Sequence, residues 1–352
     1  MTSVKVGRSA DLAATGEKWR DLEQRAAGSF FQSWSWTGTL AAERFPDPIV
    51  VEATEAGRTV ALALFNRGRR SFGSSTLYLG ETGAAEQDCP YIEQNGVLTE
   101  AGREAELTAL CLRAVASRCR LVLSGVAEAQ LPAIRRAAHL TLVTRSQASP
   151  CVDLAVVRAA GNDYLGQCSA NTRQQIRRSD RFYQQQGSIE DETAPSVEAA
   201  HVMLDEMAAL HQTTWTARGH PGSFHRPFFR RFHRALIETA LPRGEIALQK
   251  FHKKDTIIGI LYGFIYRNHM AAYQSGFAYQ ADEPRAKPGL TSHARAIQFA
   301  LDQGIDTYDF LAGEDRYKVS LANTSHRLIW VETGPFWSAG LLSRIGRQAL
   351  YQ

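Results

Sequence analysis

The fold is decided by one stretch towards the end of the chain, which reads Gly304-Ile305-Asp306-Thr307-Tyr308-Asp309-Phe310-Leu311-Ala312-Gly313-Glu314-Asp315-Arg316-Tyr317-Lys318. Gly304 suits the left-handed position that follows the last turn of a helix. Residues 307–311 combine β-branched and aromatic side chains and predict a short strand, which Gly313 ends. The polar side chains after it suggest a functional turn at the end of a strand, although a solvated turn is an equally good interpretation.

Helices and a meander of strands are predicted before this stretch. An amphipathic helix leads directly into it, over residues 290–303. Capping residues and apolar periodicity predict three earlier helices, the first capped by Asn171, over residues 171–186, 196–218 and 227–241. Runs of β-forming residues between turns predict three strands, over residues 245–251, 256–266 and 270–279. A last strand is predicted over residues 326–332.

The first half of the chain shows a similar order of elements. Helices are predicted over residues 11–27, 102–117 and 128–138. Strands are predicted over residues 48–53, 59–65, 75–79, 120–126 and 141–154. Glu55-Ala56-Gly57 separates the first two strands and predicts a hairpin. We therefore expect an α/β (α+β) fold in two halves, each a mixed, mostly antiparallel sheet flanked by helices.

Length and composition agree with two soluble domains. The 352 residues are 44% hydrophobic and 22% charged, so we divide the chain into residues 1–155, 156–340 and an amphipathic tail, 341–352. A net charge of +4 is too small to indicate nucleic-acid binding by itself. Neither a transmembrane span nor a secretory signal is visible, and the odd set of five cysteines contains no CxxC, so we expect a cytoplasmic protein with reduced thiols.

Several classes of enzyme are poor candidates. The sequence contains no GxSxG, HExxH, GxxxxGK[ST] or strand-linked GxGxxG motif. His211, His220, His225 and His233 lie close together, but their spacing does not place a ligand pair on one helical turn. We expect no metal site.

Two segments are candidate anion sites. Arg173, Arg177 and Arg181 recur every four residues with Arg178 beside them, which indicates either a solvated helix face or a site for phosphate. The segment Arg285-Ala286-Lys287-Pro288-Gly289-Leu290-Thr291-Ser292 opens a predicted helix. Free N–H groups at a helix start attract anions, although Pro-Gly before a helix is also common punctuation.

The order of meander, anion-binding turn, helix and strand with acid and tyrosine is similar to a GNAT acyltransferase core. The residues resemble the CelD/BcsL-type GNAT proteins, which are similar to FemAB-type aminoacyltransferases. The matching segments are residues 171–178, Leu210-His211 with Trp215, Arg218, Gly219, Gly222 and Phe224, then residues 273–277, Pro288-Gly289, residues 308–311, Gly313 and Tyr317-Lys318. Before residue 160 the resemblance is loose and rests on Phe31-Gln32-Ser33 with Trp36.

The resemblance implies two GNAT-like halves and a particular reaction. An acyl group would pass from a thioester, acyl-CoA or acyl carrier protein, to an amine or hydroxyl of a small-molecule, sugar or cell-envelope precursor. No permanently bound cofactor is implied. Around Gly289 the sequence departs from the [QR]-x-x-G-x-[GA] phosphate loop, so aminoacyl-tRNA remains an alternative donor, against which the modest net charge speaks. A ligand-binding sensor without catalysis is the other alternative.

The resemblance also suggests roles for individual residues. As catalytic groups we expect Asp309 and His211 as bases, Tyr317 as the acid that protonates the thiolate, and Lys318 on an anionic group. Asp309 could instead cap a turn, and His211 could simply pack on Trp215. Donor binding is expected from Arg285, Lys287, Gly289, Leu290, Thr291 and Ser292. Substrate binding is expected from Arg173, Arg177, Trp215, Tyr273, Gln274 and Phe310.

Overall fold

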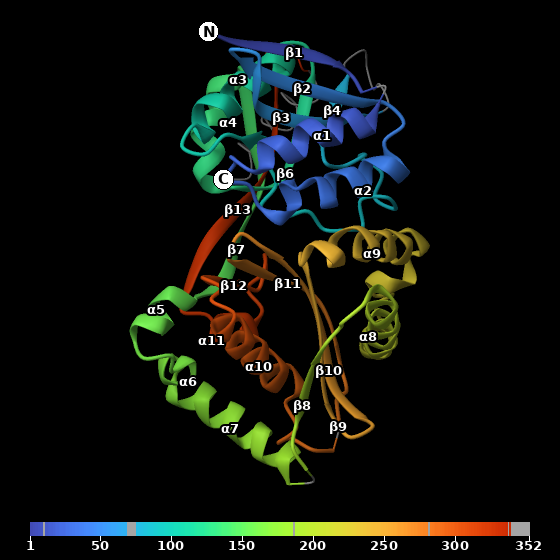
Figure 1. Cartoon of the computed structure of the whole chain (residues 1–352), viewed down its shortest axis with the longest axis vertical. Helices are drawn as coiled ribbons and strands as arrows, with labels where there is room; N and C mark the ends of the chain where they lie inside the picture. The colour runs from blue at the N-terminus through green and yellow to red at the C-terminus, as the bar shows by residue number, and fades with distance from the viewer. Residues whose placement is uncertain (10, 69–74, 186, 281, 337, 339–352) are drawn as a thin grey trace, which may run out of the picture. The chain divides into compact units, whose positions relative to one another are not determined.

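The β-sheets of two compact units organise the chain (Figure 1). One unit comprises Met1–Gln147 together with the chain from Arg327 onward, and the other comprises Ala148–His326. The computed structural model describes residues 1–9, 11–68, 75–185, 187–280, 282–336 and 338. Both units have mixed, mostly antiparallel sheets with flanking helices, which confirms the predicted fold class. The predicted tail over residues 341–352 lies outside the described residues.

In the described residues of the first unit the strand order is β1-β2-β3-β4-β6-β13, with β5 beside β3. Their bounds are β1 Thr2–Arg8, β2 Pro48–Glu55, β3 Arg58–Arg67, β4 Thr76–Leu79, β5 Leu98–Thr99, β6 Arg120–Ala127 and β13 Thr324–Gly334. β4 and β6 pair in parallel, and the other pairs are antiparallel. The helices are α1 Leu12–Glu23, α2 Trp34–Arg44, α3 Glu104–Ala116 and α4 Leu131–Ala137, with short 3-10 turns at η1 Phe30–Gln32 and η2 Glu128–Gln130.

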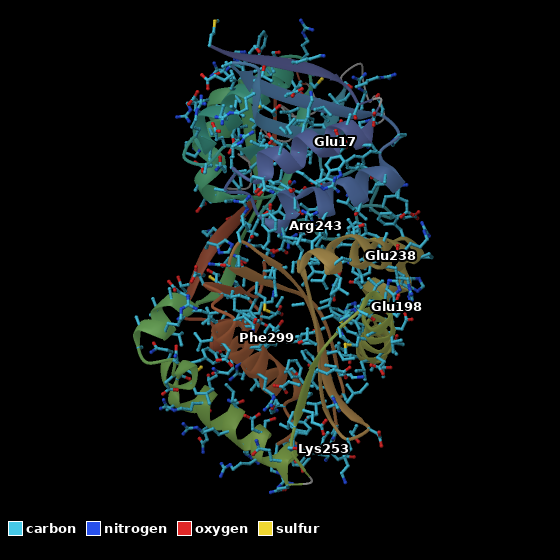
Figure 2. The ribbon with its side chains drawn as sticks, in the orientation of Figure 1. Glu17, Glu198, Glu238, Arg243, Lys253 and Phe299 are labelled. Atoms are coloured by element: carbon cyan, nitrogen blue, oxygen red, sulfur yellow. The ribbon has the colours of Figure 1, made fainter. Side chains whose placement is uncertain are left out.

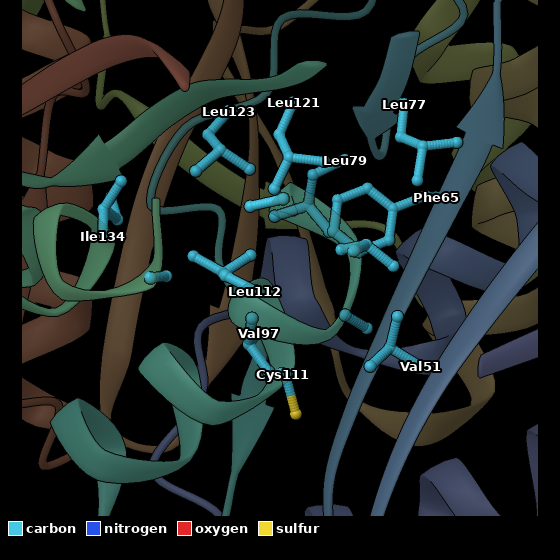
Figure 3. Close-up of a cluster of buried hydrophobic side chains, with 14 of the residues drawn as sticks. Val51, Phe65, Leu77, Leu79, Val97, Cys111, Leu112, Leu121, Leu123 and Ile134 are labelled. Atoms are coloured by element: carbon cyan, nitrogen blue, oxygen red, sulfur yellow. The ribbon is translucent and has the colours of Figure 1, made fainter. Parts of the chain in front are cut away.

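The alternation of side chains along β3 divides the core of this unit between two faces. Ala61, Ala63 and Phe65 pack with α3, whereas Leu62 and Leu64 pack with α1 and α2. Figure 3 shows the first of these clusters, in which Leu112 and Cys111 of α3 face the strand residues. Successive residues of a strand point to opposite faces, so a strand buried on both sides needs apolar residues throughout. The uninterrupted apolar run of β3 meets this need.

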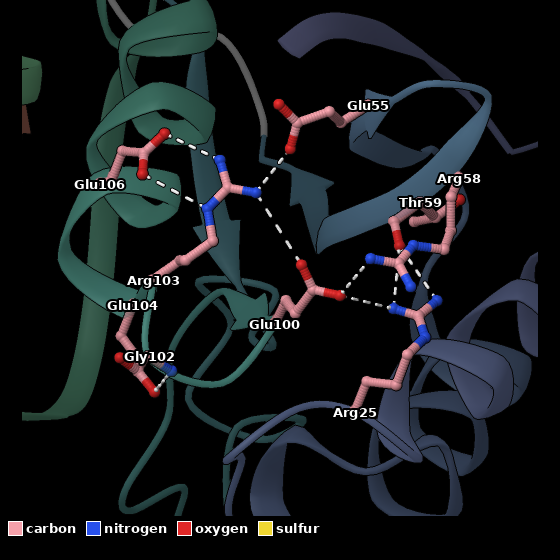
Figure 4. Close-up of polar contacts among 9 residues, drawn as sticks. All are labelled: Arg25, Glu55, Arg58, Thr59, Glu100, Gly102, Arg103, Glu104 and Glu106. Carbon is pink, nitrogen blue, oxygen red and sulfur yellow. Dashed lines mark hydrogen bonds and ion pairs between the residues drawn. The ribbon is translucent and has the colours of Figure 1, made fainter. Parts of the chain in front are cut away.

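The predicted hairpin between β2 and β3 is confirmed. Ala56 and Gly57 both have positive φ angles, 51° and 80°, as a two-residue turn of type I′ requires. Ion pairs also tie this hairpin to its neighbours (Figure 4): Arg103 at the start of α3 contacts Glu55 and Glu106, and Glu100 accepts from Arg25 and Arg58. These ion pairs link the segment after α1, the hairpin and the start of α3, and because they are partly exposed each contributes little to stability.

The sheet of the second unit has the strand order β7-β12-β11-β10-β9-β8. The bounds are β7 Leu140–Asp153, which begins in the first unit, β8 Glu190–Thr193, β9 Ile246–Lys253, β10 Thr256–Tyr266, β11 His269–Phe277 and β12 Thr307–Asp309. β11 and β12 pair in parallel, and the other pairs within this sheet are antiparallel. Lys253, labelled in Figure 2, marks the turn between β9 and β10.

Helices cover this second sheet on both sides (Figure 1). Ile176 of α7 and Ile297 of α10 share one apolar cluster with the strands. On the other side α8 lies so close to β11 that a side chain at Gly276 would lie 2.4 Å from the Met207 carbonyl oxygen. The helices are α5 Leu154–Ala159, α6 Tyr164–Gln167, α7 Ala170–Gln184, α8 Val197–Ala217, α9 Pro227–Ala240, α10 Pro288–Asp302 and α11 Arg316–Leu321, with 3-10 turns at η3 Ser223–His225 and η4 Leu241–Arg243.

Several predicted details were wrong. The cap of α7 is Ser169, whose hydroxyl accepts from the Thr172 N–H, and Asn171 lies inside the helix. Tyr317 and Lys318 lie in helix α11 and not in a turn, and α10 begins at Pro288, two residues before the predicted start. Among the helices and strands of the described residues, those that were not predicted are β1, β5, β8, α2, α5, α6 and α11. Among the described residues, no helix combines the length and apolar character needed to cross a membrane.

Candidate active site

The candidate site lies where two parallel strands of the second unit separate. β12 pairs with β11 through three residue pairs, ending at Ala271 and Asp309, while β11 continues to Phe277. After Phe310 the chain turns away, because Leu311 has a φ angle of 62° in the left-handed region. We call the region where the pairing of the two strands ends, beside the start of α11, the wedge.

Asp309 holds this turn. Its carboxylate is fully buried, and Oδ1 accepts from the Leu311 N–H at 2.7 Å and the Ser149 hydroxyl at 2.8 Å. Oδ2 lies 3.4 Å from His269 Nε2 and 3.5 Å from His326 Nε2. Burial alone would raise the pKa of Asp309, but the hydrogen bond from His269 and the charges of both histidines lower it below its usual value. The carboxylate is thus ionised and fully engaged, so we expect it to position the turn.

Lys318 completes the turn from the other side. Its buried ammonium donates to the carbonyl oxygens of Leu311 at 3.1 Å and Ala312 at 2.9 Å. A side chain added at Gly313 would come within 3.4 Å of Lys318 Nζ, and this glycine has a φ angle of 124°. The lysine therefore fixes the backbone that leads to Tyr317, a different task from the expected contact with an anionic ligand.

Tyr317 stands at the start of α11 with a ring that is 37% exposed. Partial burial, Asp315 and Tyr279 raise the pKa of its phenol above the usual value. The phenol consequently keeps its proton at neutral pH, which a general acid requires. The ring of His293 stacks against it, with centroids 5.4 Å apart and planes 23° from parallel.

His293 was not predicted to belong to the site. It lies on α10 and is 3% exposed, with Nδ1 2.8 Å from the Tyr308 hydroxyl. Nε2 is buried and has no hydrogen-bond partner among the described residues. Burial, aided by the charge of Lys318, lowers the pKa of His293 to about 3, so the ring is neutral. In the sequence this histidine falls on the apolar face of a predicted helix, and it belongs to no motif with a characteristic spacing that would identify it as a site residue.

Side chains of α7 already form hydrogen bonds with groups at the start of α10. The Lys287 N–H donates to Ser179 Oγ at 3.0 Å, and the Thr291 hydroxyl lies 2.9 Å from both Ser179 Oγ and Asp180 Oδ1. Burial raises the pKa of the Asp180 carboxyl. Of the residues expected to bind a donor, Thr291 thus has internal partners, whereas Lys287 is exposed and Gly289 and Leu290 are half-buried.

Two other residues of that segment are also turned to internal contacts. Arg285 forms an ion pair with Glu283, whose pKa it lowers to about 2, and stacks over Phe182 at 5.2 Å. Ser292 is fully buried, and a side chain added at Gly259 would lie 2.5 Å from its hydroxyl. The structure therefore leaves Lys287 exposed at the helix start, with Gly289 and Leu290 half-buried beside it.

His211 lies on the α8 side of β11. It is 6% exposed, its Nδ1 lies 3.0 Å from the Ser275 carbonyl oxygen, and its Nε2 accepts weakly from the Ser223 N–H at 3.4 Å. The carbonyl fixes the proton on Nδ1 and leaves the lone pair on Nε2. Burial lowers the pKa of His211, although the bond to Ser275 opposes this. The ring packs on Trp215 at 5.6 Å, so both the catalytic and the packing interpretation fit its position.

The expected substrate-binding residues do not form one group. Arg173 and Arg177 lie on α7, where Arg177 is exposed. Tyr273 and Gln274 are half-buried on β11, and Tyr273 packs against Phe264 and His233. Phe310 is 2% exposed and packs between His293, Tyr308 and Tyr317, so it shapes the site from inside. In the part of the chain that the structure describes, no three His, Cys, Asp or Glu residues could together hold a metal ion.

The parallel pair β11 and β12, with α10 between them in sequence and α11 after them, has the order of elements expected of a GNAT acyltransferase core. Residues 170–319 match the family model described as the acetyltransferase (GNAT) domain. This match spans most of the second unit and supports a GNAT-type acyltransferase. No curated protein matches the chain in sequence.

Solved structures share the fold at low sequence identity. The crystal structure of FemX aligns with 90% of this chain and 95% of its own, at 9% identity and a TM-score of 0.60. The C-terminal domain (DUF2156) of a protein assigned as a lysylphosphatidylglycerol synthetase, from Agrobacterium fabrum, aligns with 97% of both chains, at 13% identity and a TM-score of 0.56. The L-PGS structure from Bacillus licheniformis aligns with 93% of this chain and 96% of its own, at 11% identity and a TM-score of 0.55.

Proposed function

We propose that the protein is an N- or O-acyltransferase that takes an acyl group from acyl-CoA or acyl carrier protein. The acceptor is an amine or hydroxyl of a small-molecule, sugar or cell-envelope precursor, as the resemblance to CelD/BcsL-type proteins suggests. The observation that carries the proposal is the wedge between β11 and β12, with the protonated phenol of Tyr317 at its edge. The reaction needs an open strand edge for the donor and an acid for its leaving group.

The donor would enter along β11. Beyond Ala271, the side of this strand that faced β12 has no strand partner among the described residues, so its backbone can bind the amide groups of a pantetheine arm. The N–H groups of Gly289 and Leu290 at the helix start, with the exposed Lys287, would hold the phosphates. The Asp180 carboxylate lies close to the start of α10 and would repel a phosphate bound deep in the helix start. We therefore expect the phosphates to bind nearer the surface, beside Lys287.

The chemistry uses one group on each side of β11. The acceptor nitrogen or oxygen attacks the thioester carbonyl, and its proton passes to Nε2 of His211, directly or through water. The carbon–sulfur bond then breaks, and the thiolate takes the proton of the Tyr317 phenol. The end of β11 contacts both proposed catalytic regions. The backbone carbonyl of Ser275 contacts His211, and the ring of Phe277 packs on His293, which stacks on Tyr317.

Thermal-shift measurements with acetyl-CoA, longer acyl-CoAs and free CoA test this proposal. A ligand of the folded state raises the melting temperature in a concentration-dependent way. We expect the melting-temperature shift to be largest for acyl-CoA of one particular chain length. The shift should be smaller in Lys287→Gln, and it should persist in Tyr317→Phe, which binds the donor without turnover. If no CoA compound shifts the melting temperature, CoA is excluded as the donor, and acyl carrier protein becomes the next substrate to test.

Transfer from aminoacyl-tRNA is the second candidate. The fold shared with FemX and the exposed Arg177, Arg178 and Arg181 on α7 favour it. Binding of charged tRNA that weakens steeply with salt would support it. So would weaker binding with a shallower salt dependence when Arg177, Arg178 and Arg181 are all replaced by glutamine. A stabilising CoA ligand without any product would instead indicate a sensor that has lost catalysis.

A further inference from the structure

Exposed aromatic rings gather where α8 ends, close to the end of β11. Tyr279 is 55% exposed and Trp215 is 37% exposed. The ring of His220 lies edge-on to Trp215, with centroids 5.8 Å apart. Arg218 places its guanidinium carbon 5.8 Å from the centre of the Tyr279 ring. We call these four residues the aromatic surface.

The loop after α8 holds this surface rigidly. The His220 N–H donates to the Trp215 carbonyl at 2.9 Å, and the Gln212 amide donates to the Pro221 carbonyl at 2.7 Å. Gly222 has a φ angle of 69°, and a side chain there would lie 2.3 Å from Gln212 Oε1. The chain is thus folded back on the helix, and the rings are ordered before any ligand arrives. Ordered rings lose little entropy when a ligand binds.

Arg218 has a charge without a counterpart. Other arginines of this unit form ion pairs, as Arg158 does with Asp306 and Arg295 with Asp191. Arg218 is exposed and forms no ion pair with a carboxylate of the described residues. A guanidinium in this state is suited to a phosphate or carboxylate of a ligand.

The aromatic surface adjoins both proposed catalytic groups. Trp215 packs on His211, and Tyr279 lies near enough to Tyr317 to raise the pKa of its phenol. Tyr279 also packs on Phe277 at 6.0 Å, at the last residue of β11. A ligand on this surface would therefore present a functional group to the end of the wedge.

We propose that the aromatic surface binds the acceptor, and that the acceptor is a pyranose sugar carrying a negatively charged group. The flat C–H faces of a pyranose stack on Trp and Tyr rings, while its hydroxyls reach the imidazole and phenol groups at the rim. The anionic substituent pairs with Arg218. This inference rests on the proposed acyltransferase function and specifies the substrate class of that same site.

Calorimetric titrations of the full chain test the proposal, with glucose 6-phosphate and galacturonic acid as probes and with glucose and galactose as their neutral counterparts. The variants are Arg218→Gln and Tyr279→Ala. Arg118→Gln, which removes an exposed charge in the other unit, is the matched control. Thermal shifts with acyl-CoA are recorded on every variant, so that donor binding is followed separately.

We expect Arg218→Gln to weaken binding of the anionic sugars by about tenfold and to leave the neutral sugars unchanged. Tyr279→Ala should weaken binding of both anionic and neutral sugars, and Arg118→Gln should change binding of neither. Equal binding of anionic sugars by Arg218→Gln and Arg118→Gln would overturn the proposal. So would wild-type protein that responds to acyl-CoA but binds none of the sugars, an outcome that leaves the proposed function intact. Sugar binding without any response to acyl-CoA would support the surface and count against CoA as the donor.

Discussion

Replacing Asp309 with asparagine should destabilise the protein before it affects any chemistry. The asparagine oxygen can still accept from the Leu311 N–H and the Ser149 hydroxyl, but its amide group faces His269 and His326 where a charged oxygen stood. A lost hydrogen bond to a buried charge costs about 1.5–3 kcal/mol. In a domain of this size each kcal/mol lowers the melting temperature by about 2–4 °C, so we expect a decrease of about 3–12 °C.

The loss should depend on pH in a defined direction. The pKa of Asp309 is lowered in the folded protein, so its stabilisation is present above the pKa of an unfolded aspartate, about 3.9. That stabilisation disappears as the pH falls through the lower, folded value. The difference in melting temperature between wild type and Asp309→Asn should accordingly be full above about pH 4 and shrink below it.

Differential scanning calorimetry across this pH range, combined with acyl-transfer assays, separates the two roles of Asp309. Ser149→Ala removes another hydrogen bond to the same carboxylate and is the control; it should lower stability by a similar amount, about 1.5–3 kcal/mol. An Asp309→Asn protein with unchanged melting temperature and abolished turnover would refute the positioning role and make the carboxylate a general base.

Three further substitutions test the site. Tyr317→Phe should lower turnover by about a hundredfold or more in steady-state assays without changing the melting temperature, and full activity would exclude it as the acid. His293→Phe leaves the buried Tyr308 hydroxyl without this partner and should lower the melting temperature, whereas an unchanged melting temperature would contradict the importance of this contact. Gly259→Ala places a carbon 2.5 Å from Ser292 Oγ and should cost about 1–3 kcal/mol in denaturant unfolding, so an unchanged midpoint would contradict this packing.

The elements with strong apolar periodicity could be predicted from the sequence. β2, β3, β9, β10 and α10 carry patterns set by burial, and the Ala56-Gly57 turn follows from local backbone preference. β8 gave no signal, because Glu190–Thr193 consists of polar residues at the edge of the sheet. Its strand conformation comes from pairing with β9, which a local pattern does not record.

The candidate site could be predicted only as a region of the sequence. Residues 309–318 were singled out because a strand, a glycine and a polar group meet there, and a functional role for this region stays a prediction. The charge of Arg285 is taken up by Glu283, and that of Lys318 by backbone carbonyls, which depends on side-chain geometry. His293 and Tyr279 acquire their importance from residues distant in sequence, so local spacing could not reveal them.

The late return of β13 to the first unit affects how the protein can be made. β6 pairs with β13, whose residues come almost two hundred positions after those of β6 and follow the whole second unit in the chain. During synthesis on the ribosome, β6 therefore waits with an open edge until residues 324–334 have emerged. Such an edge attracts other strands. We therefore expect the second unit, which is continuous in sequence, to complete its fold before the first unit does.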